Sequence, residues 1–94
     1  MPLNDPEITA ALAAFPGWTL AGKAIERSFK FADFITAMAF VNRIAEVAEK
    51  ANHHPDIAIH YNQVTLSLWS HDSGGVTKRD LKMAANINEI EGNK

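Results

Sequence analysis

The proline at position 55 is the strongest constraint on how this chain can fold. Before it, residues 34–52 carry apolar side chains at helical spacing, and Asp33 stands where a helix N-cap is expected. Proline disfavours helical backbone at the residue before it, so this long helix must end at or before His54. The chain therefore passes from a helix into an extended segment within a few residues, and His53 and His54 lie at that transition.

Two further helices are predicted from capping and breaking residues. Asp5 is expected to cap a short first helix that has Pro6 at its first position and ends at the Pro16-Gly17 pair. Thr77 is expected to cap a last helix, after a loop over residues 72–75. For the long helix, the row expected to face the core is Phe34, Met38, Val41, Ala45 and Ala48, widened by Ile35, Ile44 and Val47.

The remaining segments have the period of a β-strand. Trp18 and Leu20 lead into a turn around residues 21–23, and residues 25–31 after this turn alternate between apolar and polar side chains, which gives two strands before the long helix. Residues 57–61 and 64–70 form two more strands, with Asn62-Gln63 as a two-residue hairpin turn. The order is helix, two strands, helix, two strands, helix. This order predicts an α+β fold, in which helices cover a single face of one antiparallel sheet.

Length and composition restrict the class of protein. The chain has 94 residues and 47% hydrophobic content, which suits a single domain over residues 1–94 with one core. Its net charge of −2 disfavours nucleic acid as a partner, although Lys78, Arg79 and Lys82 give one local basic patch. The absence of cysteine excludes disulfides and thiolate catalysis. The sequence contains no signal-peptide pattern and no apolar run long enough for a membrane span, so we expect a cytoplasmic protein.

Three of the four histidines are expected to converge. His53 falls in or beside the last helical turn, where the unfilled carbonyl groups and Glu49, one turn earlier, both favour a positively charged ring. If the hairpin turn lies at residues 62–63, extending its register past the strand ends places His54 opposite His71. The helix end, the start of one strand and the end of the next would then meet in one cluster of imidazoles.

Each of these residues also has a purely structural interpretation. The end of a helix suits a histidine that has no function, so His53 alone is weak evidence for a site. His60 falls outside the cluster and is interpreted as a solvated strand residue. Asp80 lies three residues after Thr77 and completes a capping-box pattern. Trp69 alternates onto the polar face of its strand, where it could line a pocket or a subunit contact.

The sequence gives little support for a zinc site, a serine nucleophile or a phosphate-binding loop. Three histidines can bind zinc, but the helical HExxH spacing is absent. Ser70 and Ser73 lie in no nucleophile-elbow pattern. The Ser73-Gly74-Gly75 segment before a helix could bind a phosphate, yet it lacks the lysine and serine of a P-loop. His53, with its charged form favoured, would be suited to hold or give a proton near neutral pH.

The spacing of these residues carries a family resemblance. The motifs are Glu49-x-x-Asn52-His53-His54-Pro55-Asp56, Tyr61-Asn62-x-Val64, Ser70-His71 and Gly75-Val76-Thr77-x-Arg79-Asp80. In this order and spacing they resemble pterin-4a-carbinolamine dehydratases. The resemblance extends from about Trp18 to the last helix and so covers most of the chain.

The resemblance implies a fold and an activity. The fold is a four-stranded antiparallel sheet with three helices packed on one face. The activity is the dehydration of 4a-hydroxytetrahydropterin, a product of aromatic amino-acid hydroxylases, to quinonoid dihydropterin. It also implies a small-molecule pterin as substrate, no cofactor, and self-association as a homodimer or a homotetramer. The implied catalytic residues are His53, His54 and His71, and the implied substrate-binding residues are Glu49, Ser70 and Asp80.

The implied reaction leads to a hypothesis about roles. His54 or His53 would protonate the leaving hydroxyl group, His71 would accept or relay the other proton, and Glu49 would tune His53 and bind the pterin's donor edge. This sequence departs from the family pattern at Ile57, where many relatives carry an aromatic residue, and at Trp69, where a small hydroxyl residue is common. The alternatives are a non-catalytic dimerisation or binding module of the same fold and a small metal-binding protein.

Overall fold

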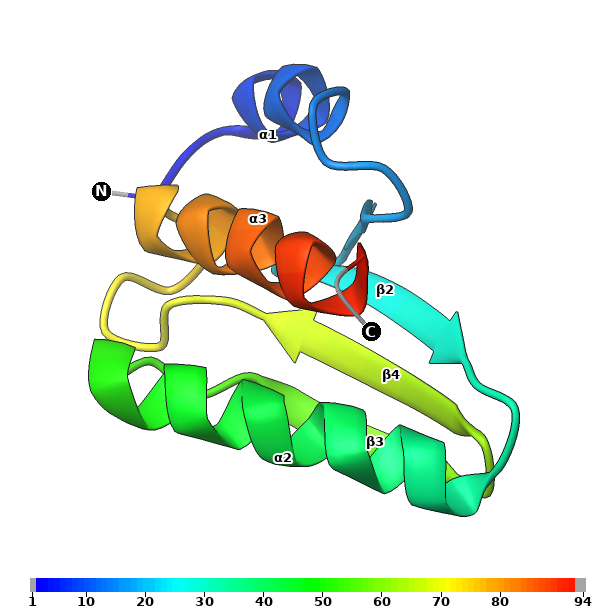
Figure 1. The fold of residues 1–94 in the computed structure, drawn as a ribbon. Helices are drawn as coiled ribbons and strands as arrows, with labels where there is room; N and C mark the ends of the chain where they lie inside the picture. The colour runs from blue at the N-terminus through cyan, green and yellow to red at the C-terminus, as the bar shows by residue number, and fades with distance from the viewer. Residues whose placement is uncertain (1, 93–94) are drawn as a thin grey trace.

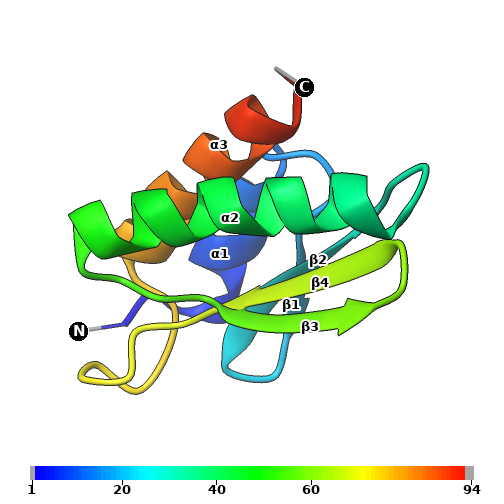
Figure 2. The same ribbon diagram turned by 60° about the horizontal axis from the view of Figure 1, so that its bottom comes forward.

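The computed structural model describes residues 2–92 and has the expected α+β architecture (Figure 1). Its elements are α1 (Asp5–Leu12), β1 (Thr19–Ala21), β2 (Ala24–Lys30), α2 (Phe34–Ala51), β3 (Asp56–His60), β4 (Gln63–Leu68) and α3 (Lys78–Gly92). The four strands form one antiparallel sheet in the order β1-β2-β4-β3, and the helices lie on a single face of it (Figure 2). Within the described residues, no helix combines the length and the apolar character that crossing a bilayer requires.

The hairpin between β3 and β4 turns one residue earlier than predicted. The structure pairs His60 with Gln63, so the two-residue turn is Tyr61-Asn62 and not Asn62-Gln63. The cause is a long-range anchor at Asn62, whose carbonyl accepts from the Phe31 N–H and whose side-chain amide donates to the Phe31 carbonyl, both at 2.8 Å. Tyr61 then adopts the left-handed conformation, with φ of +53°.

This turn shifts the β3–β4 register by two residues. Ile57 pairs with Leu66 instead of Leu68, and the predicted pairing of His54 with His71 is therefore wrong. A shift of two residues leaves every side chain on its predicted face of the sheet, because the side-chain period of a strand is also two. The faces were therefore predicted correctly although the partners were not.

The helix boundaries follow local side-chain hydrogen bonds. Asn4, and not Asp5, caps α1, because its Oδ1 accepts from the Glu7 N–H at 2.9 Å while the Glu7 carboxylate accepts from the Asn4 N–H at 3.0 Å. This helix ends at Leu12, before the predicted Pro16-Gly17 stop. Asp33 caps α2 as predicted. Hydrogen bonds from Thr36, through its side chain and then its backbone, lower the pKa of Asp33 below 3.8.

The core-facing side of α2 agrees with the predicted row only in part. Ile44 and Ala48 are buried as predicted, but Ala37 and Phe40 are buried as well, and Phe34 and Ile35 are exposed. Phe40 sets this orientation, because its ring packs against Phe29 and Phe31 with centroid distances of 4.9 and 5.0 Å. The core between the helices and the sheet is completed by Ile8, Trp18, Ile25, Val64, Leu66, Leu68, Val76, Met83, Ala84 and Ile87.

Candidate functional site

A left-handed residue at the end of α2 separates the two adjacent histidines. Asn52 has φ of 50° and ψ of 43°, and its N–H bonds back to the Glu49 carbonyl. The His53 N–H bonds to the Ala48 carbonyl at 3.1 Å, which completes a Schellman motif. The chain then leaves the helix sharply, so that His53 is buried under α3 while the next residue, His54, is exposed.

His53 is held by a buried aspartate. Its Nε2 lies 2.5 Å from Oδ1 of Asp80, and the two side chains are 10% and 0% exposed. The other carboxylate oxygen of Asp80 accepts from Ser70 Oγ at 2.9 Å and from the Thr77 N–H at 2.8 Å. Because both oxygens are occupied, Asp80 is held rigidly and fixes both the position and the tautomer of the imidazole.

Asp80 therefore serves two purposes. It follows Thr77 by three residues and bonds back to the Thr77 N–H at the start of α3, as the capping-box pattern predicts. It is also fully buried, as is Ser70, and neither residue lines the pocket described below. Both are predicted to bind the substrate. In this structure Asp80 contacts His53, Ser70 and Thr77, and Ser70 Oγ contacts Asp80 and, at 2.7 Å, the hydroxyl group of Thr77.

Glu49 pairs with His54, whereas the prediction places it against His53. Its Oε2 lies 2.6 Å from Nε2 of His54, and the side chains are 78% and 55% exposed. The expectation that Glu49 would lie against His53 is therefore wrong. The left-handed turn at Asn52 is the reason, because it carries His53 inward to Asp80 and leaves His54 over the last turn of the helix.

His71 reaches the same region from the other side of the fold. It follows β4 in a loop that closes on itself, because Ser70 forms an isolated β-bridge with Gly75 and its carbonyl accepts from the N–H groups of Ser73 and Gly74. The imidazole of His71 lies against the indole of Trp69, with ring centroids 3.9 Å apart and an angle of 31° between the planes.

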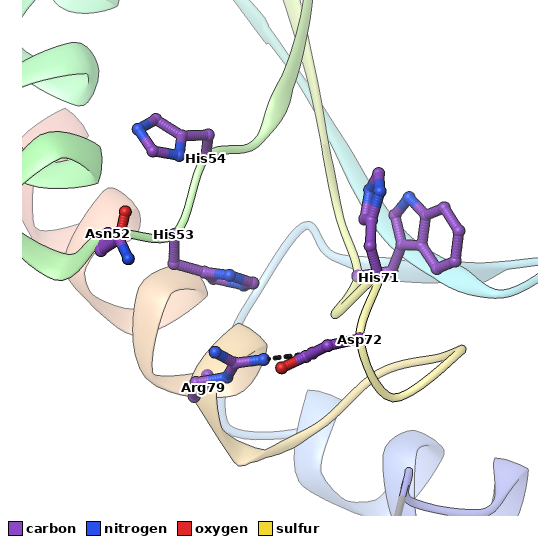
Figure 3. Close-up of a pocket in the computed structure, with 7 residues that line it drawn as sticks. Asn52, His53, His54, His71, Asp72 and Arg79 are labelled. Carbon is purple, nitrogen blue, oxygen red and sulfur yellow. Dashed lines mark hydrogen bonds and ion pairs between the residues drawn. The ribbon is translucent and has the colours of Figure 1, made fainter.

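The three histidines line one pocket of about 410 Å³, a size within the range of about 300–1,000 Å³ that is typical of small-molecule sites (Figure 3). The lining residues are Asn52, His53, His54, Trp69, His71, Asp72 and Arg79. Figure 3 shows the His53 ring extending toward the middle of this group, with the His54 ring turned away from it. The predicted convergence is thus confirmed, although it does not arise from a pairing of His54 with His71.

Two charged residues of the pocket received no role in the sequence prediction. Arg79 and Asp72 form an ion pair across the pocket, with Nη2 and Oδ1 2.6 Å apart. The available signal was the position of Arg79, which directly precedes Asp80 at the start of α3 and so shares its end of the fold. Within residues 2–92, no three His, Asp or Glu side chains are arranged to hold a metal ion.

Comparisons of sequence give one consistent result. Residues 1–90 match the family model described as pterin 4 alpha carbinolamine dehydratase. The chain is 59% identical over 88 residues to a protein of Koribacter versatilis that carries this enzyme's name provisionally, and the match covers 94% of each chain. A similarly named protein of Gloeobacter violaceus is 57% identical over 87 residues, covering 88% of this chain and 95% of the other.

Comparisons of structure agree. The crystal structure of a transcriptional coactivator/pterin dehydratase from Brucella melitensis superposes with a TM-score of 0.91 at 43% identity, and covers 96% of this chain and 98% of its own. A pterin dehydratase-like protein, identified as a RuBisCO assembly factor of the alpha-carboxysome, has a TM-score of 0.70 at 22% identity over 81% of this chain and 90% of its own. The second likeness concerns the fold alone.

Proposed function

The chain belongs to the pterin-4-alpha-carbinolamine dehydratase family, and we propose that it catalyses the dehydration of 4a-hydroxytetrahydropterin to quinonoid dihydropterin. The observation that carries this proposal is the arrangement of three imidazoles around one pocket, each with a different side chain in contact with its ring. Such an arrangement suits proton transfers near neutral pH, because histidine is the side chain that titrates in that range.

The reaction requires two proton transfers. The C4a–O bond breaks, and the hydroxyl group leaves as water after it receives a proton. The neighbouring ring nitrogen N5 loses its proton, and the electrons of that N–H bond form the C4a=N5 double bond. A proton donor on one side of the substrate and a proton acceptor on the other can perform both transfers, and positioned groups of this kind typically give about 10²–10⁴-fold acceleration.

We assign the donor role to His53 and the acceptor role to His71. Asp80 holds the Nε2 proton of His53, so that in its imidazolium form His53 delivers the Nδ1 proton to the leaving hydroxyl group. His71 lines the same pocket from the β4 side and is exposed, so it can pass the N5 proton to solvent, and His53 regains from solvent the proton that it gave. His54, turned outward and held by Glu49, contributes less and contacts the substrate at the rim of the pocket.

The same proposal includes the cellular setting of the protein. The reaction uses no cofactor and no metal, takes place in the cytoplasm and serves the recycling of tetrahydropterin. The protein acts as a homodimer or homotetramer. Support for self-association comes from the edge strand β3, where Ile57 and Ile59 are 39% and 37% exposed and every residue is accessible. Light scattering coupled to size exclusion will show a monomer if this part is wrong.

The second candidate function is a non-catalytic binding module. One observation favours it, namely that the similar protein of Brucella melitensis is called a transcriptional coactivator as well as a pterin dehydratase. This function would need an accessible surface for a partner, but it would not need ordered imidazoles in the pocket. The buried hydrogen bond between His53 and Asp80 favours the enzyme, because desolvating a carboxyl group is costly and a binding module has no use for an oriented imidazole.

The deciding experiment follows the dehydration of freshly generated 4a-hydroxytetrahydropterin by its ultraviolet absorbance. We expect clear acceleration by the wild type and a loss of about 10²–10⁴-fold in His53→Ala and in His71→Ala. His60→Ala is the matched control, because His60 is exposed on β3 and lines none of this pocket. No acceleration by the wild type would overturn the enzyme in favour of the binding module.

A further inference from the structure

Each histidine of the pocket has one neighbouring side chain in contact with its ring. Asp80 holds His53, and Glu49 holds His54. Among the described residues, His71 has no hydrogen-bond or ion-pair partner for its ring, and its defined contact is with the indole of Trp69. The centroid distance of 3.9 Å and the angle of 31° describe a close, tilted stack of the two rings.

The position of Trp69 follows from the continuing alternation of β4. Trp69 and His71 flank Ser70, which pairs with Gly75 in an isolated bridge and points to the opposite side. Ser70 is fully buried against Asp80, whereas Trp69 and His71 both line the pocket. Because side chains two residues apart share a face of a strand, the buried Ser70 fixes the stack on the pocket side.

We propose that Trp69 is a positioning residue for His71. This inference rests on the proposed dehydratase function and adds to it the residue that orients the proton acceptor. The indole covers one face of the imidazole and limits its rotation, so that a ring nitrogen stays directed into the pocket.

The test separates an effect through His71 from a direct effect on the substrate. Trp69→Leu keeps an apolar side chain but removes the aromatic face, and Trp69→Phe keeps an aromatic face. We expect Trp69→Leu to lower kcat by about three- to ten-fold, with a smaller change in KM, and Trp69→Phe to restore most of kcat. In a His71→Ala background, Trp69→Leu should change kcat by less than about two-fold, because the residue it positions is gone.

A second measurement, by NMR, does not depend on enzymatic activity. A stacked indole shifts the ring-proton resonances of His71 in a proton NMR spectrum, and His71→Ala identifies those resonances. We expect them to move in Trp69→Leu and to stay in place in Trp18→Phe, a matched control in which the other tryptophan, buried and bonded to Asn88, is replaced.

The outcomes are distinguishable. Resonances of His71 that stay in place in Trp69→Leu would overturn the stack, whatever the activity. An equal loss of kcat in the wild-type and His71→Ala backgrounds would also overturn the proposal, since Trp69 would then act on the substrate directly. If the wild type has no dehydratase activity, the proposed function fails, and movement of the resonances would still support the held imidazole.

Discussion

The two adjacent histidines at the end of α2 have carboxylate partners in opposite environments. His53 and Asp80 form a pair that is 10% and 0% exposed, and two further donors occupy the aspartate. His54 and Glu49 form a pair of almost the same length, 2.6 Å against 2.5 Å, but 55% and 78% of these side chains are exposed. Geometry alone therefore does not distinguish the two pairs.

The difference in burial determines what each pair contributes. A charged group that is removed from water is stabilised only by its partners. Replacing one member of a buried ion pair therefore typically lowers the free energy of unfolding by about 3–5 kcal/mol. An exposed pair is screened by water and salt and contributes about 0–1 kcal/mol. We therefore expect the His53 pair to matter for both folding and catalysis, and the His54 pair to adjust activity only slightly.

The largest effect is expected from His53→Ala. It leaves the buried Asp80 with two of its three hydrogen-bond donors, so the free energy of unfolding should fall by about 3 kcal/mol. The matched variant His54→Ala should lower it by less than about 1 kcal/mol. Urea denaturation of both variants at pH 7 measures this difference. Equal losses would show that burial does not separate the two pairs.

The next effect concerns the support of the buried carboxylate. Ser70→Ala removes the donor to Asp80 Oδ2 and should lower the free energy of unfolding by about 1–3 kcal/mol. Ser28→Ala is the control, because Ser28 also bonds a threonine hydroxyl, at 2.8 Å, but at an exposed position, and should cost less than about 0.5 kcal/mol. If Ser70→Ala and Ser28→Ala lower the free energy of unfolding equally in urea denaturation, Asp80 does not need the hydroxyl group of Ser70 as a donor.

The sequence predicted those parts of the fold that depend on local patterns. Pro55 sets the limit before which α2 must end, and the alternation of strand and helix periods gives the order of the elements. The capping relation of Thr77 and Asp80 was also readable, because it spans only three residues. Convergence of three histidines followed from element ends that meet, and it did not require the right register.

The parts that could not be predicted depend on tertiary contacts. The hairpin register depends on two hydrogen bonds between Asn62 and Phe31, which are far apart in sequence. The buried face of α2 depends on the packing of Phe40 against two strand phenylalanines. The pairing of Glu49 with His54, and of His53 with Asp80, depends on the left-handed backbone of Asn52, which helical spacing does not reveal.

A smaller effect should come from the residue that separates the two pairs. Asn52→Ala places an ordinary side chain at φ of 50°, and should lower the free energy of unfolding by about 1 kcal/mol. Asn52→Gly should be neutral, because glycine adopts this conformation without strain. Thermal unfolding of both variants measures the contrast. Destabilisation by glycine as large as by alanine would show that the amide of Asn52, and not its backbone, holds the turn.

The smallest effect is expected from Glu49→Gln, which removes the charge of the exposed partner. Stability should change by less than about 1 kcal/mol, because water screens a pair that is this accessible. At about 1 M salt the Debye length falls to about 3 Å, so the wild-type dehydration rate should approach that of the variant, whose own rate should not depend on salt. A loss of activity as large as that of His53→Ala, persisting at high salt, would mean that Glu49 contacts the substrate itself. The exposed pair would then equal the buried pair in importance, through binding and not through orientation of His54.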